Sequence, residues 1–203
     1  MIYQLKSKTD KEYVFDEESS TNFFSYTALV EEVNSLMNKL PDYLNPDTYH
    51  WNLFITDVCL AKKYGCSYSK GYTDYNEHNI YIPCTLEGVY LGLSHEIGHM
   101  VDAMLGISDT KEWQDIFAEF KQKYRNSTVF QELGIEEQRL TEREFFAEVF
   151  QVFLNDKYFD LYSKHDYIYF DNRSYFRELY CFMGRCVDLL FFKKNNINVL
   201  FYE

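Results

Sequence analysis

The stretch from about Leu86 to Leu105 most constrains what this chain can fold into. It contains no proline, Gly106 follows it, and apolar residues recur along it at helical spacing: Leu91, Leu93, Met100, Val101 and Leu105. This pattern predicts one long helix that ends at the glycine. Three polar residues, His95, Glu96 and His99, interrupt the apolar run near its middle.

The spacing of these polar residues favours metal binding. Residues four apart lie close together on one face of an α-helix, so His95 and His99 can direct their imidazoles at the same ion. Neutral imidazole suits Zn²⁺, and Glu96 would lie beside the open coordination position, where a carboxylate can take a proton from water. The alternative is a helix turn with two histidines that only pack or face solvent. The apolar residues on both sides of the motif disfavour it.

A zinc site needs a third protein ligand, and a carboxylate from a second helix is the usual source. The predicted helix over 141–155 offers Glu144 and Glu148, which are four residues apart and so share a face. The alternative is a solvated acidic helix face. The histidine motif upstream favours the metal.

Two stretches, SHEIGHMVDAMLG and EREFFAEVFQVF, resemble the catalytic domain of anthrax lethal factor and its smaller relatives, the clostridial Pro-Pro endopeptidases. The resemblance covers roughly Tyr75 to Leu190. It implies an α+β, zincin-like fold: a small mixed sheet, an active-site helix and a helical C-terminal half. It also implies a zinc metalloendopeptidase that hydrolyses an extended protein segment.

The resemblance assigns roles residue by residue. It implies one Zn²⁺ per chain, with His95, His99 and Glu144 as ligands and Glu96 as the general base. Glu148 would support a ligand histidine, and Asp102 would be structural or lie just outside the ligands.

The sequence departs from the family at one position. The family has a tyrosine seven residues before the third ligand, where it stabilises the oxyanion of the reaction, and this chain has Glu137. A carboxylate would repel that charge. The candidates for a replacement donor are Tyr158, Tyr162 and His165, with Tyr124 as an outside candidate.

The rest of the chain predicts a single domain over 1–203, with an N-terminal helix and strands in 1–70 and the catalytic core in 71–203. We expect strands at 2–5, 50–56 and 79–83, a loop over 62–79, and helices at about 27–40, 109–124, 141–155 and 172–192. As an edge strand, 79–83 would align a substrate by β-addition. The aromatic fraction of 19% predicts an aromatic core.

Charge and cysteine content restrict the partners. The net charge of −12 disfavours a nucleic-acid partner and favours a basic protein or peptide. Five cysteines without a CxxC pair argue against a disulfide framework and fit a reducing compartment. We expect no signal peptide and no membrane span. The cysteines favour the cytoplasm or delivery into a host cytosol, whereas the resemblance favours secretion. The oligomeric state is open.

Two other functions compete with the endopeptidase. A zinc protease that cleaves a bacterial repressor also pairs HExxH with a glutamate helix, but its usual ending of small apolar residues and proline is absent here. A zincin-fold binding or toxin-associated module with weak or lost activity would explain the missing tyrosine. The intact HExxH speaks against that module.

Overall fold

The computed structural model describes residues 26–56, 71–125, 127–132, 140–161 and 176–195. Within these residues the protein is α+β, with a small three-stranded mixed sheet and helices elsewhere. The chain forms two compact units, Met1–Ile97 and Gly98–Glu203. None of the described helices has both the length and the apolar character needed to cross a bilayer. The strand expected at 2–5 lies outside the described residues.

The first unit begins with helix α1 (Tyr26–Met37), which confirms the helix expected at 27–40. Its apolar residues recur every three or four positions and form part of the core: Leu29, Val33, Leu36 and Met37, followed by Leu40. Two 3₁₀ turns come next, η2 (Asp42–Leu44) and η3 (Pro46–Tyr49). They lead directly into the sheet.

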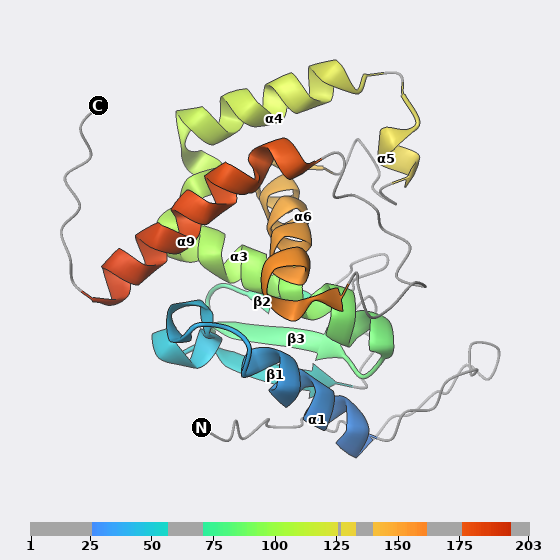
Figure 1. Cartoon of the computed structure of the whole chain (residues 1–203), viewed down its shortest axis with the longest axis vertical. Coiled ribbons are helices and arrows are strands. Elements are labelled where there is room, and N and C mark those ends of the chain that lie inside the picture. Colours follow the sequence, from blue (N-terminus) through green and yellow to red (C-terminus); the bar gives the residue numbers. More distant parts are fainter. Residues whose placement is uncertain (1–25, 57–70, 126, 133–139, 162–175, 196–203) are drawn as a thin grey trace. The chain divides into compact units, whose positions relative to one another are not determined.

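The sheet consists of β1 (Asn52–Thr56), β2 (Tyr72–Asp74) and β3 (Asn79–Pro83), in the order β1-β3-β2 (Figure 1). β1 runs parallel to β3, and β2 runs antiparallel to it. One face of β3 contributes Ile80 and Ile82 to the core, both fully buried. The other face carries Tyr81, which stacks on Phe54 of β1.

Two expectations about the sheet were wrong. The strand over 79–83 is present, but it is the central strand and not an edge, because it pairs with a neighbour on each side. The second error is β2, which lies inside the predicted loop 62–79. It is only three residues long, and a turn follows in which the Asp74 carboxylate accepts hydrogen bonds from the backbone N–H groups of Asn76 and Glu77.

The helix expected at 86–105 begins at Leu86, as predicted. After Leu86 and Glu87 it contains a π-helical turn, η4 (Gly88–Gly92), and α3 (Leu93–Leu105) continues from that turn. Single π turns are frequent beside functional residues. Gly106, with φ of 66°, ends the helix as predicted. At that end the Lys193 ammonium donates a hydrogen bond to the Met104 carbonyl (2.6 Å).

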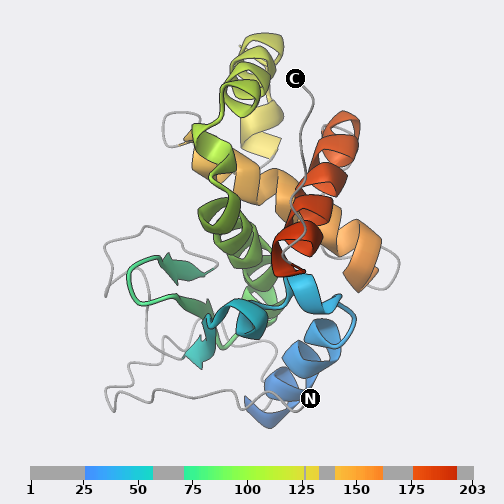
Figure 2. The ribbon, with the colours of Figure 1, turned by 90° about the vertical axis from the view of Figure 1, so that its left-hand side faces the viewer.

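The second unit is helical, with α4 (Lys111–Lys123), α5 (Val129–Glu132), α6 (Glu142–Leu154) and α9 (Tyr180–Lys194). The short turns are η5 (Ile107–Asp109), η6 (Asn155–Phe159) and η7 (Arg177–Leu179). α6 contacts both α4 and α9 (Figure 2). The core of this second unit is rich in aromatic residues, as the composition predicted. Its fully buried aromatic side chains are Trp113, Phe145, Phe146, Phe150, Phe159 and Phe176. The expected helices at 109–124 and 141–155 are confirmed, as is the described part of 172–192.

Candidate metal centre

Helix α3 places both histidines of the motif in a buried setting. His95 and His99 lie one turn apart, and only 8% and 6% of their surfaces are exposed. Buried imidazoles are costly without a polar role, because their ring nitrogens lose water. Their position on one helix face fits two ligands of a single ion.

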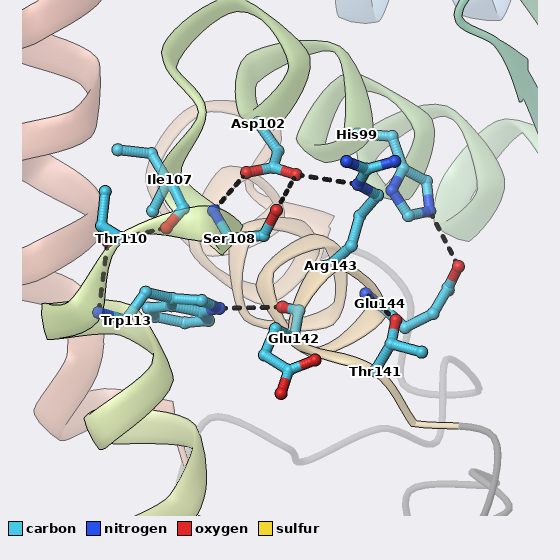
Figure 3. Close-up of polar contacts among 10 residues, drawn as sticks. All are labelled: His99, Asp102, Ile107, Ser108, Thr110, Trp113, Thr141, Glu142, Arg143 and Glu144. Atoms are coloured by element: carbon cyan, nitrogen blue, oxygen red, sulfur yellow. Dashed lines mark hydrogen bonds and ion pairs between the residues drawn. The ribbon is translucent and has the colours of Figure 1, made fainter.

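Helix α6 supplies the third group. The Glu144 side chain, 47% exposed, faces His99, and its Oε1 lies 3.5 Å from the His99 Nε2 (Figure 3). One ligand atom from each of His95, His99 and Glu144 lies within 4.8 Å of the others. Two ligands on tetrahedral zinc, at bond lengths of about 2.0–2.2 Å, are separated by about 3.4 Å. The His99–Glu144 distance is close to that separation and is longer than a good N–H···O hydrogen bond, so this pair is compatible with two ligands of one metal ion.

The start of α6 is held by three sets of polar contacts (Figure 3). The Trp113 indole N–H donates a hydrogen bond to the Glu142 carbonyl (2.8 Å). The Thr141 hydroxyl accepts a hydrogen bond from the Glu144 N–H (3.2 Å), a regular N-cap. The Arg143 guanidinium donates to the Asp102 carboxylate (3.2 Å), which also accepts from the Ser108 N–H and hydroxyl (2.6 and 2.7 Å). Asp102 is 1% exposed. It therefore ties the residue next to Glu144 to the end of α3 and to the turn that follows.

Close approach of α3 and α6 depends on Gly98, the fourth residue of the histidine motif. A Cβ at this position would lie 2.9 Å from the Ala147 Cα and 3.2 Å from its carbonyl oxygen. These are backbone atoms, so they cannot rotate away. Two small residues thus let the backbones of the two helices pass close to each other, near the start of the helix that carries Glu144.

The candidate general base is buried beside the sheet. Glu96 is 3% exposed, and its Oε2 accepts a hydrogen bond from the Thr73 hydroxyl of β2 (2.6 Å). Gly71, just before β2, packs against the same side chain, where an added Cβ would lie 2.5 Å from the Glu96 Cγ. Sequence reasoning missed both residues, because they lie in the segment expected to be a loop.

The structure describes two of the four residues proposed as oxyanion donors. Tyr162 and His165 lie outside the described residues. Tyr158 follows Glu144 by fourteen residues along α6 and η6, which is about 20 Å of helix rise and makes it an unfavourable candidate. Tyr124 directly follows α4 as its C-cap residue, and its ring packs on Phe120.

Two other residues were predicted to lie near the site, Asp102 and Glu148. Asp102 has the structural contacts given above. Glu148 is half-buried on α6, one turn after Glu144, and its support of a ligand histidine stays a prediction. Besides Thr73 and Gly71, sequence reasoning missed Arg143. A glycine within a buried helix was a usable signal for the close approach at Gly98, since glycine there weakens a helix unless packing requires it.

Comparison with known proteins adds no assignment. No family model matches the chain, and no curated protein matches it significantly. The candidate site therefore rests on the residues and their geometry.

Proposed function

We propose that the protein is a zinc-dependent endopeptidase of the lethal-factor type. The observation that carries the proposal is the convergence of His95, His99 and Glu144 within 4.8 Å, with the buried Glu96 adjacent to the first ligand. Each residue type suits its role: neutral imidazoles and one carboxylate for zinc, and a second carboxylate for proton transfer.

The division of chemistry follows from these positions. His95, His99 and Glu144 would hold the zinc, which would supply Lewis acidity towards a peptide carbonyl and an attacking water near neutral pH. Glu96 takes the proton from the attacking water and delivers it to the departing amine. Its burial keeps bulk water from competing for that proton.

An extended peptide is the substrate that best fits the sheet. β2 lies at one edge of the described sheet and pairs with β3 on its other side. A substrate strand can therefore add to β2, and β2 is the strand whose Thr73 contacts Glu96. This replaces the alignment expected on β3. The acidic net charge of −12 favours a basic substrate segment.

The test compares the wild-type protein with Glu96→Gln and His99→Ala. We expect about one zinc per chain in the wild type and cleavage of an unstructured protein that a chelator stops. Glu96→Gln should keep its zinc and lose about 10²–10⁴-fold in turnover, because only proton transfer is removed. His99→Ala should lose both zinc and turnover. A wild-type protein without zinc, or equal zinc in His99→Ala, contradicts the assignment.

The second candidate function is a zinc-binding interaction module without peptidase activity. The observation that favours it is in the sequence, where Glu137 stands at the position at which the family has its tyrosine donor. One such donor contributes about 10²–10³-fold in rate. Zinc-loaded wild-type protein that cleaves no peptide in a library digest would favour the module over the endopeptidase.

A further inference from the structure

The contact between β2 and Glu96 is short and buried. The Thr73 hydroxyl lies 2.6 Å from the Glu96 Oε2, and the two residues are 5% and 3% exposed. Hydrogen bonds from a hydroxyl to an ionised carboxylate have this length and are about twice as strong as neutral ones. The Thr73 hydroxyl therefore holds one particular oxygen of Glu96.

Gly71 closes a second side of the same carboxylate. A Cβ built on Gly71 would lie 2.6 Å from the Glu96 Oε1 and 2.9 Å from its Cδ. The backbone at Gly71 thus occupies the space into which the Glu96 side chain would otherwise turn. With Oε2 accepting a hydrogen bond from Thr73 and Oε1 packed towards Gly71, the carboxylate is held in one orientation.

We infer that Thr73 is a positioning residue for Glu96: its hydroxyl fixes the carboxylate in the orientation that proton transfer requires. The inference rests on the proposed function for the role of Glu96. It also gives β2 two tasks, because the strand that would align the peptide holds the base at the same time. The position of the base relative to the scissile bond is then set by a single strand.

A merely structural role makes a different prediction. If the Thr73 hydroxyl only satisfied a buried carboxylate, its loss would lower stability and leave the turnover of folded protein unchanged. If it positions Glu96, its loss lowers kcat at a temperature where the variant is fully folded. Binding of the peptide should be little affected, so KM should stay near its wild-type value.

The kinetic experiment uses Thr73→Val, which keeps the shape of the side chain and removes the hydroxyl, and Thr73→Ser, which keeps the hydroxyl. Thr48→Val is the matched control, because the Thr48 hydroxyl makes an equally short bond (2.6 Å) to the Asp42 carbonyl at an exposed position. We expect Thr73→Val to lower kcat by about 10²-fold, Thr73→Ser to restore most of it, and Thr48→Val to leave it unchanged. Equal kcat values for Thr73→Val and the wild type would overturn the inference. If Thr73→Val does not fold, Thr73→Ala takes its place in the same comparison.

A second readout needs no activity and separates this inference from the proposed function. Urea unfolding midpoints of the full chain are compared for Thr73→Val made in the wild type and in Glu96→Leu. With Glu96 present, the substitution leaves a buried carboxylate without its donor, so the midpoint should fall. With Leu at 96 it should stay level or rise, because both groups are then apolar. Equal decreases in the two backgrounds would show that Thr73 does not hold Glu96, whether or not the protein is a peptidase.

Discussion

The close approach of α3 and α6 at Gly98 can be tested by adding a single methyl group. Gly98→Ala places a Cβ 2.9 Å from the Ala147 Cα, and 3.2 Å from both the Ala147 carbonyl oxygen and the Phe150 Cβ. Carbon atoms in contact are ordinarily about 3.5–4.0 Å apart, so the two helices must separate locally by about 0.6 Å or more. Gly184→Ala is the matched control: Gly184 also lies within a helix, α9, and a Cβ there has no neighbour within 4 Å.

The expected magnitudes follow from two opposing effects. Replacing a helical glycine by alanine stabilises a helix by about 1 kcal/mol, and this applies at both positions. Overpacking of a well-packed interior costs about 1–3 kcal/mol, and this applies only at Gly98. Gly98→Ala should therefore lower the free energy of unfolding by about 0–2 kcal/mol, whereas Gly184→Ala should raise it by about 1 kcal/mol.

The assay is thermal unfolding followed by circular dichroism, with a chelator present so that metal binding does not contribute to stability. The two variants should differ by about 1–3 kcal/mol in the free energy of unfolding. For a chain of this size, each kcal/mol shifts the unfolding midpoint by about 2–4 °C. Gly98→Ala should unfold at the lower temperature. If it unfolds at or above the midpoint of Gly184→Ala, the helices do not pass as closely as the contact at Ala147 requires, and the argument fails.

Two further predictions concern other side chains of the second unit. Arg143→Ala should weaken zinc binding by about 10–100-fold in a chelator competition, because the residue next to Glu144 is then no longer bonded to Asp102. The control Arg185→Ala, which removes an exposed ion pair with Glu112, should leave zinc binding unchanged. Equal zinc affinities of Arg143→Ala and the wild type would contradict the role of Arg143. Burial raises the pKa of the Cys186 thiol from 9.0 to about 12. An unfolded thiol has the lower pKa, so the stability that Cys186 contributes should be complete below about pH 9 and lost as the pH rises towards 12. Alkylation at pH 8 should therefore label the exposed Cys181 before Cys186, as mass spectrometry can measure.

The sequence predicted the elements that have strong periodicity. The helix carrying His95 and His99 and the helix carrying Glu144 were both recognisable, because apolar residues recur along them, and Gly106 marks the end of the first. Helical spacing alone also implied that the two histidines share a face. The chemistry of zinc made Glu144 and Glu148 candidates for the third ligand, and only the resemblance selected Glu144, because local patterns do not indicate which side chains meet.

The sheet was predicted less well, for physical reasons. A strand of three residues such as β2 has too few positions to show alternation, and the turn residues around it dominate the local signal. The pattern of β3 indicated a strand but not its neighbours, so its central place was not foreseeable. The bond from Thr73 to Glu96 joins residues 23 positions apart. Such a contact depends on the tertiary fold, and no local pattern contains it.

The order of strands in the small sheet has a consequence for how the chain folds. β2 and β3 are joined by only the short turn between Asp74 and Asn79, and hairpins of this kind form within microseconds. β1 must instead pair with β3 across a separation of 27 residues, from Asn52 to Asn79. Closing this longer loop costs more conformational entropy than closing the hairpin. The hairpin can therefore form first and serve as the template onto which β1 docks. Thr73 would then be in place to receive Glu96 before the sheet is complete.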